Sequence, residues 1–216
     1  MATRTLGKAQ IVGDGKKSAK LVMKTIEVPA LDKRTMHVTV IGETPLITHQ
    51  WSVKARQQIK DKQAKAATKP REAKDPQAEF ESSIYRLPDG RSAIKASSFK
   101  LAAVSAASLT GLRTRAALGG FFVIGDLLPI EGSKPQMRED MVRVGKFPAV
   151  TTDIRYRAEF WPWKVKLTIT YNAGLLSPAQ IVNLLNHAGF SIGVGEWRPE
   201  KRGTFGMFHV GTAEES

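Results

Sequence analysis

The residues with the most evident chemistry lie at positions 193–210, in the stretch GVGEWRPEKRGTFGMFHV. Glycines bracket a tryptophan and three cations, and glycine lets a backbone take positive φ or approach another group closely. An aromatic ring among cations, on a loop with accessible amides, suits a phosphate backbone and a stacked base. A tight hairpin with ordinary turn glycines is the equal alternative. The glycines are Gly193, Gly195, Gly203 and Gly206, and the side chains between them are Trp197, Arg198, Lys201 and Arg202.

A second group of cations occupies positions 54–74, which carry eight Lys or Arg against two acids. Ser52 is a suitable N-cap, and the residues after it favour a helix over 52–67. A helix that is polar nearly all round is not held by a core face, so it is either solvated or lies against phosphates. We favour phosphate contact because the whole chain shares the charge bias. The cations counted as candidate nucleic-acid contacts are Lys54, Arg56, Lys60, Lys62, Lys65, Lys69 and Arg71.

Composition indicates an anionic partner for a chain of 216 residues. The formal net charge is +13, from 33 Lys plus Arg against 20 Asp plus Glu, which favours nucleic acid first and an anionic surface second. The absence of cysteine excludes disulfides and thiolate metal sites. No apolar run is long enough to span a bilayer, and the first residues lack the apolar core of a secretory signal. We therefore expect a soluble, cytoplasmic protein with no membrane contact.

The four histidines offer the main alternative, an enzyme. A metal-independent endoribonuclease would use His37, His49 or His209 with nearby lysines, but the sequence places no partner beside any of them, and the role of His187 stays equally open. The chain contains no metal-ligand cluster, nucleotide-phosphate loop or nucleophile elbow. We assign no catalytic residue, no metal and no cofactor, and we expect the protein not to be an enzyme.

Hydrophobic periodicity then supplies the elements that must position these groups. Strands are predicted at 36–41, 118–124, 137–145, 152–160, 163–171 and 204–210, from β-branched enrichment or period-two alternation. Helices are predicted at 75–85, at 99–109 with Ser97 or Ser98 as cap, and at 178–189 with Ser177 as cap and Gly189 as the end. The strand at 152–160 should have a solvated charged face. Further candidate contacts on these elements are Lys100, Arg155, Arg157, Lys164 and Lys166.

The order of these elements predicts an α+β fold. Two βαβ halves make a ferredoxin-like or RRM-like antiparallel sheet with helices on one face and the other face free for a ligand. Residues 35–210 form this domain, with a basic helical insertion at about 52–85. Residues 1–34 are predicted to be a flexible basic arm with one short element near 21–26, and residues 211–216 a tail.

Three stretches resemble the RAMP superfamily, the RRM-like proteins that include the backbone subunits of CRISPR effector complexes. They are TPL at 44–46, IKASSFK at 94–100, where Lys95 and Ala96 replace the family's Pro and Gly, and the glycine loop at 193–206. The segments TPLITHQW, REAKDPQAEFESSIYRLPDG, MREDMVRVG and GVGEWRPE are also similar to small phage proteins from replication neighbourhoods. The resemblance implies backbone-type binding of a single strand by repeated subunits, with the basic insertion as a thumb, in a phage-infected bacterial cell.

Charge and resemblance together favour a single-stranded nucleic-acid-binding protein, which coats the strand as a cooperative helical filament. A phage single-stranded-DNA-binding role in replication or recombination fits this hypothesis, although the residues do not distinguish DNA from RNA. Two alternatives stay open. One is the RAMP-type endoribonuclease, and the other is a basic phage structural protein that lies against packaged nucleic acid.

Overall fold

The computed structural model describes residues 6–12, 20–51, 53–64, 73–145 and 148–212. The chain divides into two compact units, residues 1–33 and 34–216. The first unit contains two antiparallel strands, β1 (Leu6–Val12) and β2 (Lys20–Ile26), paired from end to end. The expected element near 21–26 therefore exists, and it has a partner strand that the sequence analysis did not anticipate.

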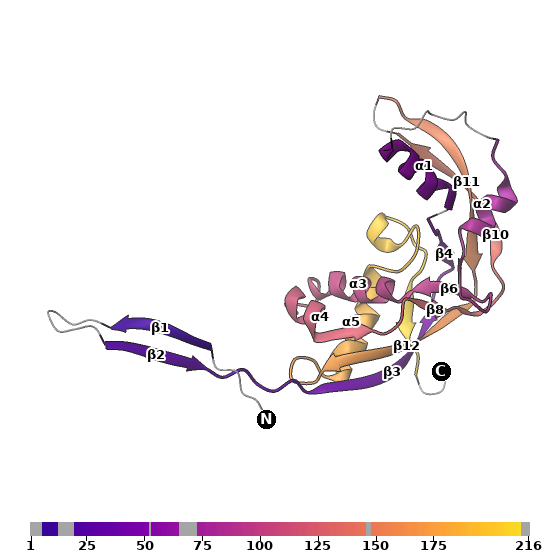
Figure 1. The fold of residues 1–216 in the computed structure, drawn as a ribbon. Coiled ribbons are helices and arrows are strands. Elements are labelled where there is room, and N and C mark those ends of the chain that lie inside the picture. The colour runs from indigo at the N-terminus through magenta and orange to yellow at the C-terminus, as the bar shows by residue number, and fades with distance from the viewer. Residues whose placement is uncertain (1–5, 13–19, 52, 65–72, 146–147, 213–216) are drawn as a thin grey trace. The chain divides into compact units, whose positions relative to one another are not determined.

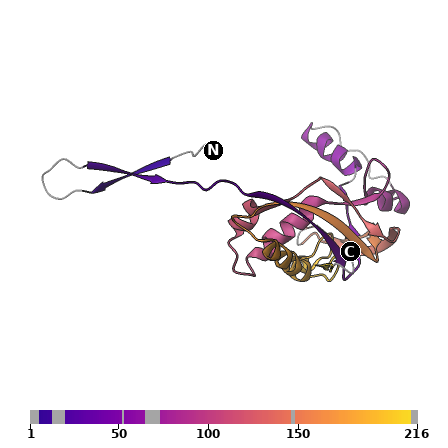
Figure 2. The ribbon, with the colours of Figure 1, turned by 90° about the horizontal axis from the view of Figure 1, so that it is seen from below.

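The main sheet of the second unit brings together strands that are far apart in sequence. Its order is β13-β3-β12-β7, and β9 pairs with the first residues of β12. The long strands β3 and β12 lie side by side in the middle (Figure 2). The strands are β3 (Lys33–Gly42), β7 (Phe121–Val123), β9 (Glu131–Gly132), β12 (Trp163–Asn172) and β13 (Phe208–Val210).

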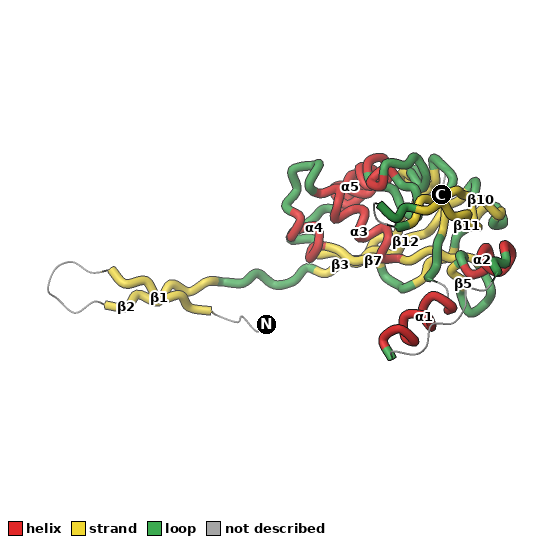
Figure 3. The backbone as a smooth tube through the Cα atoms, turned by 90° about the horizontal axis from the view of Figure 1, so that it is seen from above, coloured by secondary structure: helices red, strands yellow, loops and turns green. Residues whose placement is uncertain are grey.

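Three helices pack on one side of this sheet (Figures 1 and 3). Along β12 the odd-numbered residues from Trp163 to Tyr171 are buried and the even-numbered ones are not, as the period-two pattern predicts. Phe99 of α3 meets Phe208 of β13 edge to face, with ring centroids 5.5 Å apart. This core fixes one face of the sheet and leaves the other uncovered by these helices. The helices are α3 (Ala96–Ala107), α4 (Thr114–Gly120) and α5 (Pro178–Ser191).

A second, three-stranded sheet has the order β10-β11-β4. Its strands β10 and β11 form a long antiparallel ribbon, and α2 packs against β11 (Figure 1). The backbone N–H of Ala158 in β11 donates to the Ser83 hydroxyl at 2.9 Å, which joins the end of α2 to the ribbon. The elements are β4 (Leu46–Thr48), α1 (Val53–Gln63), α2 (Pro76–Ser82), β10 (Gln136–Val144) and β11 (Thr151–Phe160).

The remaining elements are short. A third sheet has the order β5-β6-β8, and a single 3₁₀ turn, η1, lies in the glycine loop. The α+β class and the antiparallel pairing are confirmed for the described residues. Within them, no helix is long and apolar enough to cross a membrane. The bounds are β5 (Tyr85–Arg86), β6 (Ser92–Lys95), β8 (Leu127–Pro129) and η1 (Pro199–Lys201).

Helix ends show where local signals are sufficient and where packing overrides them. Asp75 and Ser177 cap α2 and α5 as their sequences indicate, and Ser177 forms a full capping box. The expected serine cap of α3 is wrong, because the helix already begins at Ala96 and Lys95 takes the N-cap position. Gly189 does not end α5. A Cβ there would lie 1.7 Å from the Phe208 carbonyl oxygen, so this glycine permits close approach of helix and strand.

Two predicted strands are shorter than expected. Of the apolar run at 118–124, only Phe121–Val123 is a strand, because its first residues complete the helix Thr114–Gly120. The final strand covers Phe208–Val210 rather than 204–210. The predicted cap Ser52 lies outside the described residues, as do residues 213–216 of the expected tail.

Candidate nucleic-acid interface

The glycine loop, residues 193–206, folds back on itself through backbone hydrogen bonds and packs on β4. Gly195 has φ +79°, and a Cβ there would lie 2.4 Å from the Ile47 carbonyl oxygen. Gly206 has φ +66°, and a Cβ there would lie 1.8 Å from the Val194 carbonyl oxygen. Only glycine fits either position. The glycines therefore serve close backbone packing.

Most of the loop's amides are already engaged inside the protein. The N–H of Val194 donates to Gly206 O at 2.9 Å, and that of Glu196 donates to Ile47 O at 3.0 Å. The expectation of amides open to a phosphate is therefore wrong for these positions. The same holds for the N–H groups of Gly193, Gly203, Phe205 and Gly206, which donate to Ala188, Arg198, Trp197 and Pro45.

Arg198 holds the loop together rather than extending from it. Its Nε and Nη2 donate to Glu200 Oε2 at 3.1 and 2.6 Å, and its Nη1 donates to the Gly195 carbonyl at 3.0 Å. The next residue back, Trp197, has φ 53°, a left-handed conformation that costs a tryptophan on the order of 1–3 kcal/mol. The clamped loop maintains this strain and leaves the Trp197 residue 39% exposed.

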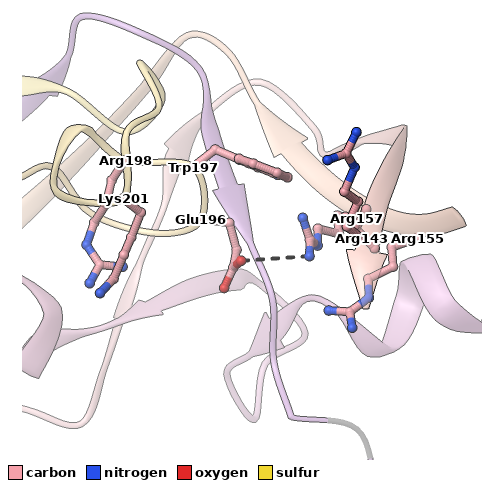
Figure 4. A pocket seen from close by; sticks show the side chains of 8 residues that line it. Arg143, Arg155, Arg157, Glu196, Trp197, Arg198 and Lys201 are labelled. Carbon is pink, nitrogen blue, oxygen red and sulfur yellow. Dashed lines mark ion pairs between the residues drawn. The ribbon is translucent and has the colours of Figure 1, made fainter. Parts of the chain in front are cut away.

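The ring borders a pocket of about 340 Å³ between the ribbon and the loop (Figure 4). This volume lies at the lower end of the range for small-ligand pockets, which is about 300–1,000 Å³. One wall comes from β10 and β11 and the other from the glycine loop. Five of the eight lining side chains are cations and one is an acid. The pocket is lined by Val142, Arg143, Arg155, Arg157, Glu196, Trp197, Arg198 and Lys201.

Arg157 is the unusual member of this group. It is only 3% exposed, so the predicted solvated face of 152–160 is wrong at this position, because the loop wall covers it. Its Nη2 lies 3.8 Å from Glu196 Oε2 and its Nη1 lies 3.7 Å from Asp140 Oδ2, both beyond hydrogen-bond length. Its buried Nε and Nη1 have no hydrogen-bond partner among the described residues. Burial lowers the pKa of Arg157, while the carboxylate of Glu196 opposes that change.

Glu196 is the acid that faces this guanidinium. The His49 imidazole, with Nδ1 3.8 Å from Oε1, and the Arg157 charge hold the pKa of the Glu196 carboxyl below its usual range, although burial acts in the opposite direction. Sequence reasoning placed no carboxylate beside His49. Sequence reasoning also did not include Arg143 among the candidate contacts. The only sign of its role was its position near the end of the predicted strand at 137–145.

The predicted phosphate contact at Lys100 is wrong, because this side chain is already engaged within the fold. Its ammonium donates to the carbonyl oxygens of Ala117, Leu118 and Phe121 at 2.6, 3.0 and 2.5 Å, so it joins α3 to the end of α4. It also lies 3.8 Å from the centroid of the Phe121 ring. Burial lowers the pKa of Lys100 to about 8. All three ammonium protons are used within the fold, and this lysine is not a phosphate contact.

The other predicted contacts that the structure describes are not among the residues that line the pocket. Lys164 and Lys166 alternate with the buried residues of β12 and lie on the opposite face of the sheet from the helices, where Lys166 pairs with Glu131 at 3.4 Å. Arg56 donates to the Trp51 carbonyl at 3.3 and 3.2 Å. Lys60 and Arg202 are exposed, Lys54 and Lys62 belong to α1, and Lys65, Lys69 and Arg71 lie outside the described residues.

The histidines do not converge on one site. His37 Nδ1 lies 3.2 Å from Thr168 Oγ1 on the main sheet, and His209 Nδ1 lies 3.0 Å from Glu43 Oε1. His187 is a residue of α5, and His49 faces Glu196. Among the described residues, no group of three or more His, Asp or Glu side chains is placed to hold a metal ion.

No family model matches this chain, and no curated protein sequence matches it.

Proposed function

We propose that this protein binds single-stranded nucleic acid, and that the pocket between the ribbon and the glycine loop is the centre of the binding surface. One observation carries the proposal: Arg143, Arg155, Arg157 and Lys201 surround a single cavity that has the half-exposed Trp197 ring in its wall. Cations suit phosphates in any sequence, and an exposed ring suits a base that is not held in a duplex.

The arrangement of the main sheet supports a ferredoxin-like or RRM-like fold. Across the sheet, the strands β13, β3, β12 and β7 are the fourth, first, third and second in chain order. Helix α3 lies between the first and second of them in the chain, and α5 lies between the third and fourth. We propose that this core belongs to a phage-encoded relative of the RAMP superfamily. The ribbon and the helices α1 and α2 are then the insertions that hold the strand.

The paired strands of residues 1–33 support self-association. A two-stranded hairpin alone is marginally stable in water, so it gains stability from docking on another surface. We propose that this unit reaches a neighbouring copy on the same strand. Head-to-tail contacts of that kind do not close, and they produce a helical filament.

The direct test compares a labelled single strand with a duplex of equal length across a salt series. The single strand should bind more tightly, and log affinity should fall steeply with log salt concentration as counterions are released. Arg155→Gln should weaken binding. Arg115→Gln, which makes the same substitution on the exposed surface of α4, is the matched control. Affinity that stays unchanged from low to physiological salt would contradict the proposal.

The alternatives predict different results in the same assay. A structural protein that lies against packaged nucleic acid would bind single strand and duplex alike. An endoribonuclease would shorten a labelled RNA in the presence of chelator. Neither result is expected from a site in which five of the eight lining side chains are cations and another is the exposed Trp197.

A further inference from the structure

The pocket carries more positive charge than one internal phosphate requires. Glu200 pairs with Arg198, and Glu196 lies against Arg157, so two of the five lining cations have a nearby acid. The other three have no carboxylate partner among the described residues. These three are Arg143, Arg155 and Lys201.

The buried guanidinium of Arg157 adds a second, independent observation. An unpaired buried donor carries a desolvation penalty, and a charged one carries more. The side chain of Arg157 is 4% exposed, and its closest acids lie at 3.7 and 3.8 Å. The side chain of Glu196 is 41% exposed, so it can turn toward solvent and leave this position to a ligand oxygen. The guanidinium therefore has carboxylates nearby but two donors, Nε and Nη1, whose hydrogen bonds a ligand oxygen would supply.

We propose that the pocket binds a terminal phosphomonoester of the strand, with the terminal base against Trp197. This inference rests on the proposed function and specifies which part of the strand the pocket binds. A phosphodiester within the chain carries one negative charge, whereas a phosphomonoester carries about 1.5 to 2 near neutral pH and presents three acceptor oxygens. Three cations without a carboxylate partner in the described part of the chain, together with the two Arg157 donors that form no hydrogen bond there, match the second group better than the first.

The ring and the cations also have suitable relative positions for one nucleotide. The Arg157 Cζ lies 6.0 Å from the centroid of the Trp197 ring, so a base on the exposed part of that ring has its phosphate within reach of the β10 and β11 arginines. The pocket is open to solvent on one side, and its volume of about 340 Å³ suits one nucleotide rather than a run of several.

The test uses the full chain and three oligonucleotides of one sequence, carrying a 5′-phosphate, a 3′-phosphate or no terminal phosphate. One phosphorylated end should bind about tenfold more tightly than the unphosphorylated strand, as charge-assisted hydrogen bonds would provide. The advantage should shrink as pH falls from 7.5 to 5, because the phosphate, whose second pKa is about 6, then keeps a single negative charge. Calorimetry with a nucleoside monophosphate, with inorganic phosphate as its control, tests the pocket without a strand.

Two variants assign the effect to the pocket. Arg155→Gln and Lys201→Gln come from opposite walls, and each should reduce the advantage of the phosphorylated end, whereas Arg115→Gln on α4 should preserve it. Thermal unfolding checks that each variant is folded. A preference that survives both pocket variants would show that the terminal phosphate binds elsewhere, and it would overturn the assignment.

The results separate this inference from the proposed function. Equal affinity for all three oligonucleotides overturns the terminal-phosphate site and leaves single-strand binding intact. Binding of the nucleoside monophosphate without binding of any oligonucleotide supports the site and contradicts the proposed function. Binding of none of these ligands contradicts both.

Discussion

Replacing Glu196 by glutamine gives the sharpest test of the pocket's electrostatics. Its carboxylate lies 3.8 Å from the Arg157 guanidinium, in the position that a ligand phosphate would take. Two unit charges 4 Å apart interact by about 4 kcal/mol at an effective dielectric constant of 20. The Glu196 side chain is 41% exposed, so solvent screening reduces the gain from removing its charge to about 1 kcal/mol. Glu196→Gln should therefore bind a single strand about fivefold more tightly.

The assay is fluorescence anisotropy of a labelled single strand at low and physiological salt. Glu131→Gln is the matched control, because it makes the same charge change beside Lys166 on the main sheet. The Glu196 variant should exceed this control at both salt concentrations. If Glu196→Gln instead weakens binding, the carboxylate orients Arg157 for the ligand, and the view of Glu196 as a competitor is wrong.

Three further predictions address the ring, the lysine and the N-terminal unit. Trp197→Ala should weaken single-strand binding by about 1–3 kcal/mol with little change in melting temperature, whereas loss of thermal stability typical of a buried aromatic would indicate a packing role. Lys100→Met should lower the free energy of unfolding by about 2–3 kcal/mol, because three carbonyls lose a charged donor, and a titration should show unchanged nucleic-acid affinity. Deleting residues 1–30 should reduce cooperativity on long strands more than affinity for a short oligonucleotide. Electron microscopy that shows only isolated monomers on saturated long strands would exclude the filament.

Local sequence signals were sufficient for elements that have one face in the core. The alternation from Trp163 to Tyr171 located β12, and Ser177 with Pro178 located the start of α5. The apolar run at 118–124 was wrongly predicted to be a strand along its whole length, because apolar residues without a clear period fit either a helix or a strand. The Lys100 ammonium at the end of α4, a tertiary contact, helps to fix this helix end.

The candidate site was predicted in its residue types but not in its geometry. Arg155, Arg157, Trp197, Arg198 and Lys201 do line one pocket. The burial of Arg157 could not be seen, because alternation along 152–160 places it with Asp153 and Arg155, and the covering loop lies some forty residues later. The two acids that face cations in the loop were equally hidden, since only the folded loop directs Glu196 to Arg157 and Glu200 to Arg198.

The two walls of the pocket belong to different parts of the fold, and this division gives ligand binding a structural consequence. The ribbon is inserted between β9 and β12, whereas the loop follows α5. They meet through the long ion pair of Arg157 and Glu196, and through the Arg138 guanidinium, which lies 4.6 Å from the centroid of the Phe205 ring. The ion pair exceeds hydrogen-bond length, so it holds the two walls together less tightly than a direct hydrogen bond would. A bound phosphate would join Arg143 and Arg155 of the ribbon to Lys201 of the loop. The ligand itself would then fix the ribbon against the main domain, and the folded state would gain stability in proportion to the logarithm of ligand concentration once the site is saturated.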